Sequence, residues 1–160
     1  IEKRLDGEGA DYCRSVMLGI MIETPASAIT AEAFAKQCDF FSIGTNDLVQ
    51  YITAADRGNA DVENVYNPCH PAVLKMLYNV ISAGAKAGIE VSVCGDMAAN
   101  PVFTELLLGM GLKKFSVPLP MVSRIKHKIG SADLNEAKAL AEKVLETEDE
   151  KEIINILRKE

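Results

Sequence analysis

The chain has few of the residues that mark specialised sites. Among its 160 residues there is no tryptophan, there are two histidines, and 6% are aromatic. Its four cysteines, Cys13, Cys38, Cys69 and Cys94, lie far apart and form no CxxC pair. This spacing argues against a structural zinc site, and the lack of a secretory signal favours reduced thiols over disulfides. We therefore expect a cytoplasmic protein.

Several familiar sequence patterns are missing as well. No apolar run approaches the ~20 residues of a membrane-spanning helix. No GxGxxG or GxxxxGK[ST] pattern occurs, so the usual glycine-rich nucleotide loops are absent. The net charge of −6 argues against nucleic acid as a partner. The chain begins with Ile1 rather than methionine, and we expect it to be an excised piece of a longer protein.

Four short apolar runs alternate with longer helix-like stretches. The expected strands are residues 16–22, 40–44, 89–93 and 114–117. The expected helices are residues 25–36, 47–55, 72–86, 101–109, 122–129, 132–145 and 150–157. This alternation predicts parallel strands joined by right-handed crossovers. Because the strand runs are apolar at successive positions, we expect helices to cover the sheet on both faces.

The pattern predicts one α/β domain over residues 1–160, with a helical tail at 132–160. Two architectures agree with four such units. They make a small doubly wound sheet, or they make half of an eight-stranded barrel, which usually needs ~250 residues.

Reactive side chains stand at the carboxyl ends of three of the strand runs. Glu23 follows the first run, Asn46 and Asp47 follow the second, and Cys94 follows the third. In parallel α/β folds ligands bind at these strand ends, so we expect one shared site. Glu23 and Asp47 are suited to a hard cation such as Mg²⁺. The alternative for each carboxylate is to cap the helix that follows it.

Three basic residues have competing interpretations. Arg57 lies in a glycine-containing loop and can bind a phosphate or a carboxylate. The alternative is a surface ion pair with Asp56 or Asp61. His70 precedes a proline at a helix start, where we expect a structural or capping role, and His127 lies among basic residues on a solvated helix face.

Cys94 is the one cysteine at an expected strand end. It is either a small buried thiol or a nucleophile or proton donor. Neither neighbour is basic, and the nearby Asp96 is acidic. These surroundings favour a protonated thiol acting as a general acid over a thiolate nucleophile.

A set of motifs in one order resembles a known family. They are residues 19–26, 39–48, 50–51, 56–59, 70–74, 94–98 and 106–111. Together they resemble the phosphoenolpyruvate–protein phosphotransferases, enzyme I of the bacterial sugar phosphotransferase system, over nearly the whole chain. Pyruvate phosphate dikinase and phosphoenolpyruvate synthase share the barrel and the strand-end acids, so a fragment of either is the alternative.

The resemblance implies a fold and a set of roles. The chain would be the C-terminal half of a phosphoenolpyruvate-binding (β/α)8 TIM barrel, four parallel βα units followed by C-terminal helices. Glu23 and Asp47 would hold Mg²⁺. Asn46, Asp47 and Arg57 would bind the substrate, and Cys94 would protonate the enolate of pyruvate.

The resemblance also implies partners. The phosphoryl group would pass to a histidine on a separate N-terminal domain of enzyme I and then to a small phosphocarrier protein. Neither lies in this chain, so we expect no turnover by the chain alone. The resemblance also implies a homodimer formed through this region. A non-catalytic dimerisation module is therefore a further alternative. Asp96 and Ala99 replace the glutamate and glycine that the family usually has, and we expect the shorter acid to alter the orientation of Cys94.

Overall fold

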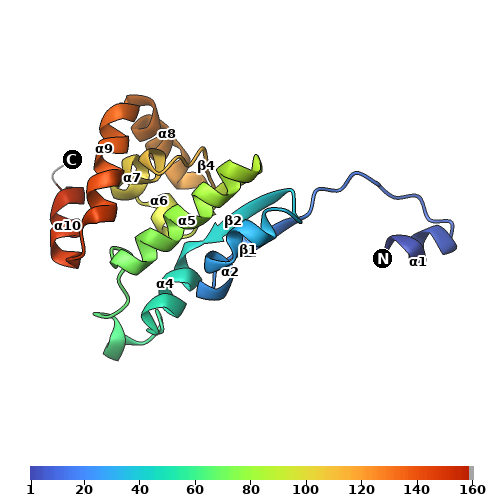
Figure 1. The fold of residues 1–160 in the computed structure, drawn as a ribbon, viewed down its shortest axis with the longest axis horizontal. Helices are drawn as coiled ribbons and strands as arrows, with labels where there is room; N and C mark the ends of the chain where they lie inside the picture. Colours follow the sequence, from blue (N-terminus) through green and yellow to red (C-terminus); the bar gives the residue numbers. More distant parts are fainter. Residues whose placement is uncertain (159–160) are drawn as a thin grey trace.

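The protein is built around a small parallel sheet. A computed structural model describes residues 1–158. Its four strands are β1 (Gly19–Ile22), β2 (Phe40–Gly44), β3 (Glu90–Cys94) and β4 (Lys114–Phe115). All pairs are parallel, and the spatial order β1-β2-β3-β4 follows the chain (Figure 1). The predicted α/β class is confirmed. This order is consistent with half of a (β/α)8 barrel and differs from that of a doubly wound sheet, whose strand order reverses.

Two strands are shorter than the sequence predicts. Val16, Met17 and Leu18 precede β1 and are 62–69% exposed. Leu18 hydrogen-bonds to Asp39: its carbonyl accepts from the Asp39 N–H, and its own N–H donates to Asp39 Oδ2. The fourth strand ends at Phe115 because the proline-rich residues 116–120 follow it, and proline has no N–H for a sheet.

The helices alternate with the strands. They are α1 (Glu2–Gly7), α2 (Pro25–Ile29), α3 (Ala31–Phe34), α4 (Thr45–Thr53), α5 (Pro71–Ala87), α6 (Asp96–Ala99), α7 (Thr104–Gly109), α8 (Val122–Ser131), α9 (Leu134–Glu146) and α10 (Glu150–Arg158), with short 3-10 turns η1 (Ala60–Val62), η2 (Pro101–Phe103) and η3 (Leu119–Met121). The single helix predicted over 25–36 is wrong. It breaks at Thr30, whose backbone leaves the helical region and whose hydroxyl donates back to the Ala26 carbonyl.

The two faces of the sheet differ. Ile22, Ile43 and Val93 lie side by side in the register and are fully buried on the face that packs against α5. On the other face the register aligns Met21, Ser42 and Ser92, and the Met21 side chain is 48% exposed. Within residues 1–158 the expectation of helices on both faces is therefore wrong, because most side chains of this second face are small, polar or exposed.

The C-terminal helices pack into the same core as the sheet. Leu140 of α9 and Ile153 and Leu157 of α10 belong to the main buried cluster. Helix α9 is capped by Asp133, which accepts from two backbone N–H groups. The predicted tail runs to residue 160, and residues 159 and 160 lie outside the described residues.

The N-terminal segment stands apart from this core. Helix α1 buries no residue, and residues 8–18 lead from it to β1 as an extended stretch (Figure 1). Across residues 1–158, no helix has the length and apolar character that crossing a bilayer requires.

Candidate functional site

The predicted site residues lie at the carboxyl ends of neighbouring strands, at the same end of the sheet. The register places Gly44 opposite Cys94 and Ile22 opposite Ile43. Glu23 follows β1 directly, and the segment that carries Asn46 follows β2. Because the strands are parallel, these ends form one rim of the sheet.

Glu23 and Gly44 are in close contact. A Cβ atom added at Gly44 would lie 2.9 Å from Glu23 Oε2 and 3.1 Å from Glu23 Cβ. The Glu23 side chain therefore lies across the end of β2, where the missing side chain of Gly44 leaves room for it. The neighbouring helix α2 is capped by Thr24, in a reciprocal pair with Ser27, so Glu23 is not its cap.

Asp47 lies in the first turn of α4, which begins two residues earlier than predicted. Asp47 and Glu23 are both half-buried. Within residues 1–158 neither carboxylate takes part in a hydrogen bond or an ion pair. Half-buried carboxylates without protein donors are the kind of oxygen ligands that a divalent cation accepts.

Asn46 ties the loop after β2 to the loop after β3. Its Oδ1 accepts from the backbone N–H of Asp96 at 2.8 Å. The neighbouring Thr45, fully buried, donates to the Cys94 carbonyl at 2.7 Å. Gly95 lies between them with φ +86°, and a Cβ atom there would approach Asn46 Oδ1 to 2.6 Å. The close packing of these two loops thus requires glycine at position 95.

Cys94 lies half-buried at the end of β3, on the uncovered face of the sheet. Its thiol donates to the Ile43 carbonyl at 3.4 Å, and the Ser42 hydroxyl approaches the sulfur at 3.9 Å. The first contact needs a protonated thiol. Both partners belong to β2, so β2 orients the sulfur, while the Asp96 side chain makes no hydrogen bond to it.

Arg57 lies exposed in the loop after α4. Its backbone N–H donates to Gln50 Oε1 at 3.3 Å. The ion pairs of residues 1–158 do not include Arg57, so the alternative of a pair with Asp56 or Asp61 is not supported. Its guanidinium is available to a ligand.

Tyr66 lies beside the predicted site residues, although the sequence did not indicate it. Its hydroxyl donates to the Asn46 carbonyl at 3.2 Å. Burial is the main cause that raises the pKa of this phenol; the charges of Asp96 and Asp47 raise it further, and Arg57 lowers it. The contact with Asn46 places the Tyr66 hydroxyl beside the predicted site residues. It belongs to no recognisable motif, so only the folded loop reveals it.

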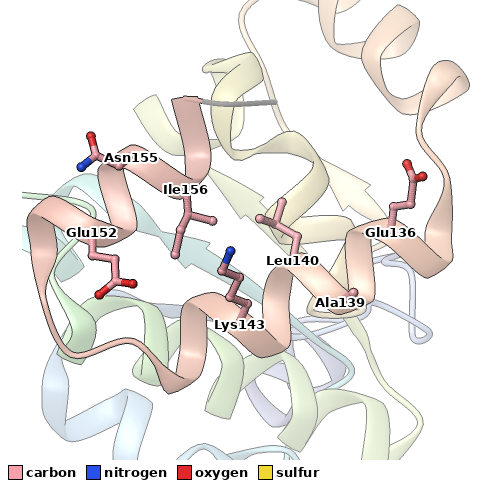
Figure 2. A pocket seen from close by; sticks show the side chains of 7 residues that line it. All are labelled: Glu136, Ala139, Leu140, Lys143, Glu152, Asn155 and Ile156. Atoms are coloured by element: carbon pink, nitrogen blue, oxygen red, sulfur yellow. The ribbon is translucent and has the colours of Figure 1, made fainter.

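Neither a preformed metal cluster within residues 1–158 nor the hollow between α9 and α10 marks the strand ends. Within residues 1–158 no group of three or more histidine, cysteine, aspartate or glutamate side chains is arranged to hold a metal ion. A hollow of about 650 Å³ lies between α9 and α10, away from the predicted site (Figure 2). Figure 2 shows Lys143 pointing into it beside Leu140 and Ile156.

Comparison with known proteins identifies the family. Residues 1–134 match the family described as "PEP-utilising enzyme, PEP-binding domain". The chain belongs to the PEP-utilising enzymes. The family predicted from the motifs is confirmed by relatives named phosphoenolpyruvate–protein phosphotransferase.

Three of these relatives show the extent of the similarity. The chain is 43% identical to the one from Buchnera aphidicola subsp. Acyrthosiphon pisum, over 98% of this chain and 28% of the relative. It is 41% identical to those from Haemophilus influenzae and Listeria monocytogenes, in each case over 98% of this chain and 27% of the relative. This PEP-utilising chain thus spans a little over a quarter of the length of these relatives.

Proposed function

We propose that this chain binds phosphoenolpyruvate at the carboxyl ends of β1, β2 and β3. It would form part of an enzyme that transfers the phosphoryl group to a protein histidine. One observation carries the proposal: Asn46 Oδ1 is held by the Asp96 N–H, which leaves its Nδ2 group free to donate. The same rim carries Glu23 and Asp47, whose carboxylates accept from no donor within residues 1–158.

Glu23 and Asp47 are the residues proposed to hold Mg²⁺. Mg²⁺ is commonly held by one or two carboxylates together with water and substrate phosphate, so two strand-end carboxylates are enough for such a site. Bound there, Mg²⁺ would offset negative charge on the phosphoryl oxygens.

Asn46 and Arg57 are proposed to hold the phosphate, with Asp47 alongside. Asn46 offers its Nδ2 donor from a fixed position, and Arg57 offers a guanidinium fork. Phosphoryl transfer relies on positioning and charge stabilisation, and these two residues supply both.

Cys94 is proposed to be the general acid. After the phosphoryl group leaves, the enolate of pyruvate takes a proton at its methylene carbon. A C–H bond forms, the S–H bond of Cys94 breaks, and the thiolate keeps the electron pair. The hydrogen bond to the Ile43 carbonyl holds the Cys94 sulfur in place for this step.

The proposed setting is that of enzyme I. The uncovered face of the sheet would face the lumen of a (β/α)8 TIM barrel whose other half is supplied elsewhere. The phosphohistidine domain of enzyme I and the phosphocarrier protein would be the partners, in the cytoplasm, with pyruvate as product and a homodimer as the assembly. The relatives' names favour this over a fragment of the dikinase or the synthase.

A non-catalytic dimerisation module is the second candidate. It is favoured by the uncovered sheet face and by the edge strand β1, since an unpaired edge invites pairing with another chain. The exposed Met21 lies at this edge.

Calorimetric titration of the chain with phosphoenolpyruvate, with and without Mg²⁺, separates the two functions. We expect saturable binding that needs Mg²⁺ and is weakened by Glu23→Gln but not by Glu136→Gln on α9. A stable dimer by ultracentrifugation without any binding would favour the dimerisation module instead. A monomer at high concentration would contradict self-association.

A further inference from the structure

Glu150, the first residue of α10, contacts a loop more than eighty positions earlier in the chain. Its Oε2 accepts from Asn67 Nδ2 at 2.9 Å. Its Oε1 lies 3.5 Å from His70 Nε2. One carboxylate thereby bridges two side chains of the segment that leads into α5.

His70 is fixed in one tautomer by its own second contact. Its Nδ1 accepts from the Ala72 N–H at 3.1 Å and caps α5. The neutral ring therefore carries its proton on Nε2, the nitrogen that faces Glu150. Nε2 lies 3.5 Å from Glu150 Oε1, a close polar contact, and the Asn67 amide makes the hydrogen bond to this carboxylate.

Asn67 is held from both ends of its amide. Its Oδ1 accepts from the Cys69 N–H at 2.9 Å while its Nδ2 donates to Glu150. The residue immediately before it is Tyr66, whose hydroxyl donates to the Asn46 carbonyl. A continuous set of contacts therefore runs from α10 through this loop to the strand-end site.

Helix α10 is itself well anchored. Ile153 is fully buried and Leu157 is 4% exposed, both in the main core cluster. Asp149 accepts from two N–H groups of the first turn, so the position of Glu150 is set by the helix start. The loop, by contrast, is mostly exposed between Asp56 and Val65.

We propose that Glu150 is a positioning residue of the ligand site: by holding Asn67 and His70 it sets the Tyr66 hydroxyl against Asn46 and orders the loop that carries Arg57. This rests on the proposed function for its ligand. The tail helix then controls how well the site holds a phosphate-bearing substrate, although Glu150 itself lies outside the strand-end rim.

The test uses residues 1–160 with four variants. Glu150→Ala removes the bridge, and Asn67→Asp sets two carboxylates against each other. Asn67→Asp combined with Glu150→Gln reverses donor and acceptor and restores the bridge, because the carboxylate introduced at position 67 still accepts from the Cys69 N–H. Glu152→Ala, on the same helix beside the α9–α10 hollow, is the matched control.

Two readouts are needed. The first is the NMR signal of the Tyr66 ring, assigned with Tyr66→Phe, together with amide exchange over residues 64–70, both without ligand. The second is the affinity for phosphoenolpyruvate with Mg²⁺. Far-UV circular dichroism checks that each variant retains its helices.

We expect Glu150→Ala and Asn67→Asp to shift the Tyr66 signal, to speed exchange over 64–70 and to weaken binding roughly three- to thirtyfold. The reversed pair should recover both readouts, and Glu152→Ala should change neither. An unchanged Tyr66 signal in folded Glu150→Ala overturns the proposal, as does weakened binding that the reversed pair fails to restore. If the unsubstituted chain binds no phosphoenolpyruvate, the proposed function fails, while the ligand-free Tyr66 readout still decides the role of Glu150.

Discussion

The Asn46 side chain accepts a hydrogen bond from the backbone N–H of Asp96 at 2.8 Å. This bond joins the first turn of α4 to the start of α6 across two neighbouring strand ends. It uses the oxygen of the amide and leaves the nitrogen for a ligand. The strand-end rim is therefore organised by contacts within the chain itself.

Asn46→Asp separates the two roles of this side chain. The carboxylate introduced at position 46 still accepts from the backbone N–H of Asp96. The free energy of unfolding should therefore change by less than about 1 kcal/mol. The donor to phosphate is lost and a negative charge is added, so phosphoenolpyruvate affinity should fall by about 2 kcal/mol, roughly thirtyfold. Calorimetry and chemical denaturation measure both. Asn155→Ala, exposed on α10, is the control, and equal affinity in Asn46→Asp would rule out the phosphate contact.

Gly44→Ala tests the position of Glu23. The backbone at Gly44 has φ −84°, which alanine adopts without strain. The new methyl group would lie 2.9 Å from Glu23 Oε2 and would push that carboxylate aside. We expect the dependence of binding on Mg²⁺ to move to concentrations about tenfold higher, comparable to the loss from disturbing a metal ligand's support. Gly130→Ala, which meets no atom within 4 Å, serves as the control. An unchanged Mg²⁺ dependence would argue against Glu23 as a ligand.

The cysteines provide a test within one molecule. Cys13 is exposed, and hydrogen bonding from Ser15 lowers the pKa of its thiol, so it should react first with iodoacetamide. Cys69 is buried and should react last. Cys94 should react at an intermediate rate that phosphoenolpyruvate and Mg²⁺ slow, while the Cys13 rate stays constant. Peptide mass spectrometry follows each site, and a Cys94 rate unaffected by saturating ligand would place this thiol outside the site.

Stability should fall at alkaline pH because of Cys69. Burial raises the pKa of this thiol from 9.0 to about 11, helped by the charge of Glu150 and opposed by Arg158. Between these two values the unfolded chain loses the proton first, so unfolding becomes easier as pH rises. The loss should reach about 2–3 kcal/mol near pH 11 and be absent below pH 8.

Denaturation curves at pH 7 to 10.5 measure this effect. Cys69→Ala should show a flatter pH dependence than the unsubstituted chain, and Cys13→Ala should not. Parallel curves for the unsubstituted chain and Cys69→Ala would contradict the assignment to Cys69.

The sequence predicts the sheet and the rim better than it predicts their surroundings. The alternation of apolar runs and helix formers gives four parallel strands, and the residues at their ends are Glu23, Asn46, Asp47 and Cys94. Periodicity did not reveal that one face is uncovered, because Met21 and Phe40 add apolar character to a face that also carries Ser42 and Ser92. The sequence also did not indicate Tyr66 or Glu150. Their roles depend on contacts between segments 20 and 83 positions apart, which no local pattern encodes.

The most direct test of the proposed function is to titrate the isotope-labelled chain with phosphoenolpyruvate and Mg²⁺ and to follow every amide signal by NMR. We expect saturable shifts centred on Glu23, Asn46, Asp47, Arg57 and Cys94, lost when Mg²⁺ is removed. Shifts centred on the hollow between α9 and α10, or no saturable shift at millimolar ligand, would contradict it.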